Sequence, residues 1–177
     1  LKIDIVASSI QVITGVIQKI NIIAKDINYK NLLFDEIKLE SNKVKIMFHL
    51  NNKEFTLNNN CKIKLNISFS EKSLKSILLS KEWDWIGTMI SNDLLNEDKL
   101  VDIIIKNNQL IIKTSKGNNP INKREKINLK TLNGKIILEN KTDDKFIKIP
   151  IEEKVYIKKI YIENNLIIIV ANSSINF

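Results

Sequence analysis

Apolar and polar residues alternate with a period of two along most of the chain. In residues 61–69 every second position is apolar, from Cys61 to Phe69, and the positions between are Lys, Asn or Ser. Successive side chains of a β-strand point to opposite faces of its sheet, so this run predicts a strand with one dry and one wet face. The same alternation recurs at 20–24, 37–39, 44–50, 147–151 and 155–162.

Asparagine marks the turns between the expected strands. Asn107-Asn108, Asn133-Gly134 and Asn164-Asn165 each separate two apolar stretches. Asn and Gly tolerate the positive φ angles that two-residue hairpin turns require. Because the chain has only 4 Gly and 2 Pro, Asn takes over the usual role of these residues. Together the strands and turns predict a meander of about nine or ten antiparallel strands.

One segment, residues 70–96, departs from this alternation. Its apolar residues recur three or four positions apart, which predicts amphipathic helix. Ser70 is the expected N-cap, and Gly87 is expected to divide the segment into two helices. A second, shorter helix is expected at 8–12, before Gly15.

Length and composition favour one domain. A chain of 177 residues with 44 % hydrophobic residues is long enough for one good core and short for two. Residues 1–177 are therefore expected to form a single α+β domain that is predominantly β. The longest apolar run, 166–171, is too short for a membrane-spanning helix. The chain begins at Leu1 rather than Met, which leaves room for a missing leader or anchor.

The formal charge of +8 suggests an anionic partner. Of 28 basic residues, Arg124 is the single arginine. Proteins that read bases or phosphates favour Arg, because its planar guanidinium pairs bidentately, so the composition argues against nucleic acid. A weak attraction to anionic lipid headgroups is compatible with the lysines.

The residue types of catalytic and metal sites are scarce. His49 is the single histidine and Cys61 the single cysteine. Alternation places His49 off the face of Val44 and Ile46, whereas Cys61 shares the face of Ile63, which argues against a Cys–His pair. One His and one Cys also argue against a zinc site, and neither a Gly-rich phosphate loop nor calcium-loop spacing occurs. We expect no catalytic residues, no metal and no cofactor, and therefore no enzyme.

Two neighbouring aromatic residues are candidates for membrane contact. Trp83 and Trp85 are the two tryptophans, and Lys72, Lys75 and Lys81 lie near them in the chain. An indole favours the boundary between hydrocarbon and water, and lysines attract lipid headgroups. The competing interpretation is that at least one tryptophan anchors the helix to the sheet.

Strands with one dry face must bury that face against something. A sheet of this size stacks on helices, folds on itself or encloses a ligand cavity, and the sequence does not distinguish a filled core from a hollow one. In the hollow case the dry face and the helical segment would line a ligand site. The expected lining residues are Ile20, Ile22, Ile37, Leu39, Ile63, Leu65, Ile67, Ile86 and Met89.

Several stretches resemble the bacterial LmeA-like phospholipid-binding proteins, a domain of unknown function. The stretch 10–26 is similar to their opening, in which an apolar run ends in Gly, here Gly15, before an alternating strand. The second strand at 34–39, the helix after Phe69 and the ending from Pro150 also fit, so the resemblance spans nearly the whole chain. It implies a long, strongly curved antiparallel sheet wrapped around one or two helices, similar to tubular lipid-binding folds. It also implies binding of phospholipid without turnover.

These observations lead to two hypotheses. The first is non-catalytic binding of a phospholipid or other acyl-chain ligand in an apolar groove or cavity of a curved sheet, at or near a membrane surface. The alternative is an envelope scaffold or adaptor that binds another protein and has a solid core without a ligand. In either case we expect a bacterial protein that is soluble or peripheral to a membrane.

Overall fold

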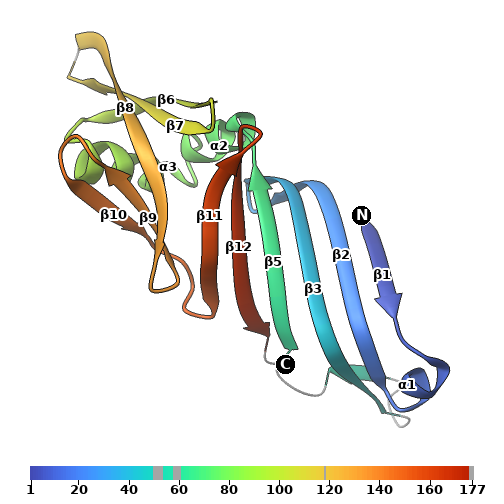
Figure 1. The fold of residues 1–177 in the computed structure, drawn as a ribbon. Helices are drawn as coiled ribbons and strands as arrows, with labels where there is room; N and C mark the ends of the chain where they lie inside the picture. Colours follow the sequence, from blue (N-terminus) through green and yellow to red (C-terminus); the bar gives the residue numbers. More distant parts are fainter. Residues whose placement is uncertain (50–53, 58–60, 118, 176–177) are drawn as a thin grey trace.

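The computed structural model describes residues 1–49, 54–57, 61–117 and 119–175, which form two antiparallel sheets (Figure 1). In the seven-stranded sheet the spatial order is β1-β2-β3-β5-β12-β11, and β4 pairs with β3. Its strands are β1 (Lys2–Val6), β2 (Val16–Tyr29), β3 (Leu32–His49), β4 (Glu54–Leu57), β5 (Cys61–Phe69), β11 (Val155–Glu163) and β12 (Leu166–Ile175). The five-stranded sheet has the order β10-β9-β8-β7-β6. Its strands are β6 (Lys99–Lys106), β7 (Gln109–Lys116), β8 (Asn119–Leu132), β9 (Lys135–Asn140) and β10 (Lys145–Ile149).

The prediction of a predominantly β, α+β fold is confirmed, because strands far outnumber helices in the described part of the chain. The strands do not form one continuous meander. The path through the large sheet passes from β5 directly to β12, and the small sheet is inserted between them in the sequence. Neither sheet closes on itself, so strong curvature remains an expectation.

In the described part of the chain, four hairpins close through two residues that both have positive φ, as a type I′ turn requires. The predicted turns at Asn107-Asn108, Asn133-Gly134 and Asn164-Asn165 are confirmed, and Lys30-Asn31 adds a fourth. Type I′ turns match the right-handed twist of the flanking strands. The asparagines therefore fix the register of these hairpins.

The register of the large sheet places the seven expected strand residues on one face. Leu39 of β3 pairs with Ile22 of β2 and with Leu65 of β5, which in turn pairs with Ala171 of β12. Ile20, Ile37, Ile63 and Ile67 share this face by the same pairing. We call this surface the dry face.

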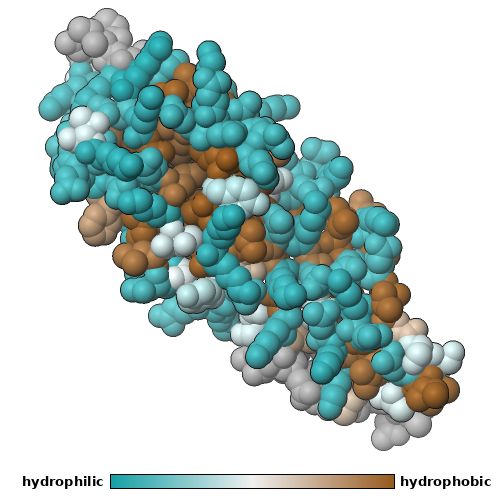
Figure 2. All heavy atoms as spheres, viewed as in Figure 1, coloured by the Kyte–Doolittle hydropathy of each residue, from teal (hydrophilic) through white to brown (hydrophobic). Residues whose placement is uncertain are grey.

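The opposite face carries cross-strand ion pairs. The Glu40 carboxylate lies 2.7 Å from Lys19 Nζ and 3.0 Å from Lys64 Nζ. Hydrogen bonds from these two lysines lower the pKa of Glu40 to about 2. Hydrophilic side chains cover much of this side of the large sheet in Figure 2. A face of this composition stays in water, so apolar contacts must form on the other side.

Helix α2 (Glu71–Leu78), helix α3 (Asp84–Met89) and the π-helical turn η1 (Ile90–Leu94) cover one end of the sheets. The buried core lies among these elements, the small sheet and the adjoining end of β11 and β12. Its most buried apolar side chains include Ile90, Leu94, Leu95, Ile103 and Ile112. The remaining helix, α1 (Ser9–Ile13), contacts β2 and has the capping box that Ser8 and Gln11 form.

The predicted N-cap of the helical segment is confirmed, but the predicted break is misplaced. The Ser70 hydroxyl accepts a hydrogen bond from Ser73 N at 3.3 Å. The break falls between α2 and α3, whereas Gly87 lies inside α3 and is buried. A Cβ at Gly87 would lie 2.7 Å from the Leu78 carbonyl oxygen and 3.2 Å from Leu100 Cδ2. The glycine thus allows α3 to pack closely against the end of α2.

We expect Gly87→Ala to destabilise the protein. Alanine gains about 1 kcal/mol of helix propensity, but overpacking of the added methyl group costs about 1–3 kcal/mol. The net loss should be about 1 kcal/mol in the free energy of unfolding, measured by urea denaturation. The exposed neighbour Thr88, changed to Ala, serves as the control and should shift stability by less than about 0.5 kcal/mol. Unchanged or raised stability of Gly87→Ala would contradict the close packing.

Candidate functional site

An apolar cavity of about 210 Å³ lies between the helices and the two sheets. All of its lining residues are hydrophobic, and they come from β3, β5, α2, α3, η1, β11, β12 and the small sheet. They include Phe34, Phe69, Leu78, Ile86 and Ile169. Because these side chains offer no hydrogen-bonding group, water has no polar partner in this space.

The volume is suited to part of an alkyl chain. An engineered apolar cavity of about 150 Å³ stays dry and binds benzene, whereas sites for drug-sized ligands span about 300–1,000 Å³. At about 210 Å³, this cavity accommodates a hydrocarbon segment but not a whole phospholipid. Any larger amphiphile must extend beyond it.

The structure brings some of the expected lining residues to the cavity and leaves others outside. Ile86 lines it, and Met89 packs against the adjoining core. The seven expected strand residues do not line it. They lie farther along the dry face, whose near end contributes Phe69, Ile167 and Ile169 to the cavity wall.

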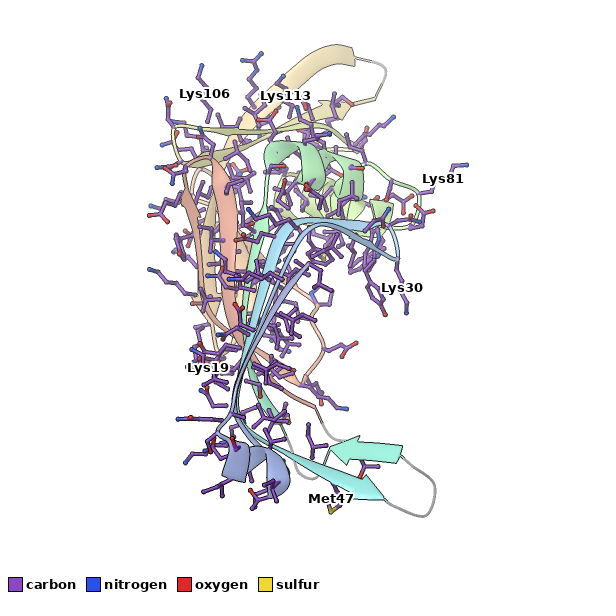
Figure 3. All side chains as sticks on the ribbon, turned by 90° about the vertical axis from the view of Figure 1, so that its right-hand side faces the viewer. Lys19, Lys30, Met47, Lys81, Lys106 and Lys113 are labelled. Atoms are coloured by element: carbon purple, nitrogen blue, oxygen red, sulfur yellow. The ribbon has the colours of Figure 1, made fainter. Side chains whose placement is uncertain are left out.

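Beyond the cavity the dry face is sparsely covered. The helices that pack against β2 and β3, among the described elements, are α1 at one end and α2 at the other. Ile20, Ile22 and Ile37 between them are half-buried, and Ile3 and Ile5 of β1 are 53 % and 60 % exposed. In Figure 3 the β2–β3 and β3–β4 hairpins lean toward the same side, away from Lys19. The apolar row thus lies on a face that is only partly covered between α1 and α2.

The sequence did not predict that residues of the small sheet line the cavity. Ile103, Ile112, Leu129 and Leu138 line it from four strands of that sheet. Their alternation is visible in the sequence and marks them as apolar-face residues. No local signal shows that this face lies opposite α2.

Helix α2 is fastened to the small sheet by an ion-pair network. The Lys75 ammonium lies 2.8 Å from Glu71 Oε1 and 2.9 Å from Asp102 Oδ1, and Lys113 Nζ lies 2.9 Å from Asp102 Oδ2. The other oxygen of Glu71 accepts a hydrogen bond from Ile105 N at 2.9 Å. We call these four charged residues the α2 latch, because they hold the helix over the cavity.

The latch shifts the titration of its carboxylates. Hydrogen bonds from Lys113 and Lys75 lower the pKa of Asp102 from its ordinary value of 3.8 to about 2. The hydrogen bond from Lys75 is the main cause of the lowered pKa of Glu71. Lys75 therefore has two carboxylate partners, which argues against its expected contact with lipid headgroups. Lys72 and Lys81 are exposed.

Aromatic and basic side chains gather beside the helices. Trp83 Nε1 donates a hydrogen bond to the Lys30 carbonyl at 3.1 Å, so this tryptophan anchors the start of α3 to the β2–β3 hairpin. Trp85 is 43 % exposed, and its ring centroid lies 6.4 Å from that of Trp83. Tyr29 is also exposed, and Lys30 and Lys81 project toward the same side in Figure 3. We call Tyr29, Lys30, Lys81, Trp83 and Trp85 the aromatic patch.

Cys61 is a half-buried free thiol on β5, and the side chain of His49 lies outside the described ones. Over the described residues, no three His, Cys, Asp or Glu side chains gather as a metal site would require. None of the helices in this part of the chain is long and apolar enough to cross a membrane.

Comparisons of the chain with protein-family models, with curated proteins and with solved structures find no match. The resemblance to the LmeA-like proteins therefore rests on the sequence patterns alone.

Acid should loosen the α2 latch. The Asp102 carboxylate has a lowered pKa, so its contribution to stability is complete above its ordinary pKa of 3.8 and is lost as pH falls toward about 2. With allowance for solvent screening we expect this loss to reach about 1 kcal/mol. Thermal melting followed by circular dichroism between about pH 5 and pH 2 measures it.

Asp102→Asn should lower the melting temperature at neutral pH. It should also reduce the fall in melting temperature between about pH 5 and pH 2. Asp144→Asn is the matched control, because Asp144 is an exposed turn residue with a positive φ that Asn also adopts. If both variants kept the wild-type pH dependence, the latch would not contribute to stability.

Proposed function

We propose that this protein binds a lipid without transforming it. An acyl chain would occupy the apolar cavity, and the rest of the ligand would extend outside it. The observation that carries the proposal is an entirely hydrophobic cavity that continues into the sparsely covered dry face. Burial of apolar surface stabilises such a complex by about 25 cal/mol per Å² removed from water.

The residues expected to contact the ligand divide into two groups. Ile86, with Met89 behind it, belongs to the cavity end, where a methylene chain would be enclosed. Ile20, Ile22, Ile37, Leu39, Leu65 and Ile67 belong to the sparsely covered part of the dry face, where a second chain or a longer one would be half covered. Ile63, on the same face, is already buried. The resemblance to LmeA-like proteins is consistent with a phospholipid as ligand and with a bacterial envelope setting.

We further propose that the aromatic patch touches the membrane from which the lipid is taken. Trp85 and Tyr29 provide large exposed rings, and Lys30 and Lys81 extend on the same side. Interfacial tryptophan with flanking lysine suits the boundary between acyl chains and anionic headgroups. The patch lies beside α2 and α3, which line the cavity.

One observation favours the alternative of a scaffold or adaptor. The edge strand β1 exposes Ile3 and Ile5, and helix α1 exposes Ile10, Val12 and Ile13. An exposed apolar edge is a suitable place for another chain to add a strand. The alternative also requires a solid core, however, and the 210 Å³ cavity argues against one.

The cavity hypothesis is tested by filling the cavity. In Ile86→Trp the larger side chain should displace about two methylene groups of a bound chain, which costs about 1.6 kcal/mol, or about tenfold in affinity. Mass spectrometry of an organic extract, beside a mock purification, gives the amount of lipid per protein. Thr88→Trp, on an exposed position of the same helix, is the control. An empty wild-type extract, together with no uptake of an uncharged apolar dye, would refute lipid binding.

The patch hypothesis is tested by co-sedimentation with vesicles. We expect the double variant Trp85→Ala/Lys81→Gln to bind phosphatidylglycerol-containing vesicles about tenfold more weakly, since a lysine near an anionic surface contributes about 1 kcal/mol and the indole adds to it. Phe146→Ala removes an aromatic residue of the small sheet that is more exposed than Trp85, and should have no effect. Equal loss in both variants would rule out a specific role for the patch.

A further inference from the structure

The two sheets meet along β8 and β11 without sharing a hydrogen-bonded ladder in the described part of the chain. This seam is fastened near its two ends. At one end Ile157 N donates to the Gly134 carbonyl at 2.9 Å. At the other end Asn108 N donates to Asn165 Oδ1 at 3.5 Å, and Asn165 N donates to Asn108 Oδ1 at 3.3 Å.

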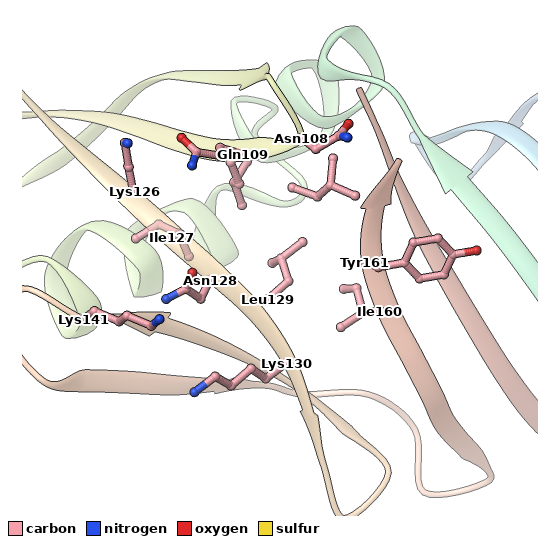
Figure 4. A pocket seen from close by; sticks show the side chains of 12 residues that line it. Asn108, Gln109, Lys126, Ile127, Asn128, Leu129, Lys130, Lys141, Ile160 and Tyr161 are labelled. Carbon is pink, nitrogen blue, oxygen red and sulfur yellow. The ribbon is translucent and has the colours of Figure 1, made fainter. Parts of the chain in front are cut away.

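A groove of about 350 Å³ lies along the seam between these fastenings (Figure 4). Lys126, Lys130 and Lys141 line it, and no carboxylate belongs to the described residues that do so. Lys130 is paired with Glu139, outside the groove lining. Lys126 and Lys141 are exposed and form no ion pair within the described chain. The groove thus presents two lysines without ion pairs, although the Glu139 carboxylate attracts Lys141 electrostatically. The side-chain amides of Asn108 and Gln109 also line it, whereas Asn128 Nδ2 donates a hydrogen bond to Glu139 Oε2 at 3.3 Å.

The floor of the groove is also a wall of the apolar cavity. Leu110, Leu129 and Ile160 line both spaces. One layer of aliphatic side chains therefore separates a basic surface groove from a hydrocarbon interior. Apolar atoms are visible between hydrophilic side chains over this region in Figure 2.

We propose that the seam is the headgroup site and the lateral entrance for an anionic phospholipid. The phosphate lies between Lys126 and Lys141, and an acyl chain passes between Leu129 and Ile160 into the cavity. This inference rests on the proposed lipid-binding function and adds the class of headgroup and its position. Ammonium groups bind phosphate as point charges, and the amide groups of Asn108 and Gln109 complete its hydrogen bonds.

The mechanics of the seam suit an entrance. Opening a ladder of strand hydrogen bonds exposes paired backbone groups and is costly. Between β8 and β11 the aliphatic side chains of Leu129 and Ile160 need to move, because the hydrogen bonds that join the sheets here, among the described residues, are confined to the two ends. The sheets can stay joined while Leu129 and Ile160 change rotamers.

The headgroup site is tested by the ratio of two affinities. Short-chain phosphatidylglycerol and phosphatidylcholine with the same acyl chains are titrated below their micelle concentrations by isothermal calorimetry. The wild type should prefer phosphatidylglycerol by about tenfold, and Lys126→Gln/Lys141→Gln should reduce this preference to about twofold. Lys99→Gln/Lys148→Gln removes the same charge from exposed lysines of the small sheet that do not line the groove, and should keep the preference.

Binding of the uncharged dye phenylnaphthylamine separates the two proposals. If the dye and both lipids fail to bind the wild type, lipid binding itself is wrong. If the dye binds but the two double variants have the same lipid preference, the headgroup site is wrong. Binding of glycerophosphate as tight as that of the lipid would identify a site for a free phosphate and would also overturn the entrance.

The entrance is tested by kinetics. Leu129→Trp should slow uptake of the short-chain phosphatidylglycerol about tenfold or more in stopped-flow displacement of the dye, because a bulky ring blocks the floor. Leu132→Trp, at an exposed position of the same strand, should not. Uptake at the wild-type rate in a folded Leu129→Trp protein would exclude passage through the seam.

Discussion

The architecture depends on the burial of a single face of the large sheet. Covalent geometry sends alternate side chains to opposite faces, so a strand cannot place Glu40 in water without turning Leu39 to the other side. Across the large sheet this produces more apolar surface than α1 and α2 cover. The cavity at one end and the sparsely covered dry face along the rest both result from the small number of covering elements.

Helix α2 covers part of this apolar surface, and polar contacts hold it to both sheets. The Asp35 carboxylate of β3 accepts a hydrogen bond from Ser70 N at the start of the helix, and the latch binds the same turn to β6. The helix therefore bridges the two sheets by polar contacts of Ser70, Glu71 and Lys75 in its first half, while its apolar side faces the cavity. Because directional bonds fix its position, dense packing beneath it is not needed to hold it there.

The local features were predictable because they depend on neighbouring residues. Strand parity at Ile63, Leu65 and Ile67, the turn at Asn107-Asn108 and the cap at Ser70 follow from side-chain periodicity and backbone preference. The features missed by sequence reasoning depend on residues far apart in the chain. Nothing near β5 indicates that β12 lies beside it, and Lys75 resembles a free lysine until Asp102 is placed opposite it. Gly87 resembles a helix breaker because its partner, the Leu78 carbonyl, approaches only in the folded state.

The pairing of β12 with β5 has a consequence for the order of folding. Strands β1 to β5 and the hairpins of the small sheet can form from contacts that are close in sequence, whereas the second edge of β5 must wait for β12, about 100 residues later. During synthesis the free edge of β5, with an isoleucine or leucine at alternate positions, is an unpaired template for any extended segment nearby. The topology therefore implies slow closure of the large sheet and a need to protect that edge until the β11–β12 hairpin pairs with it.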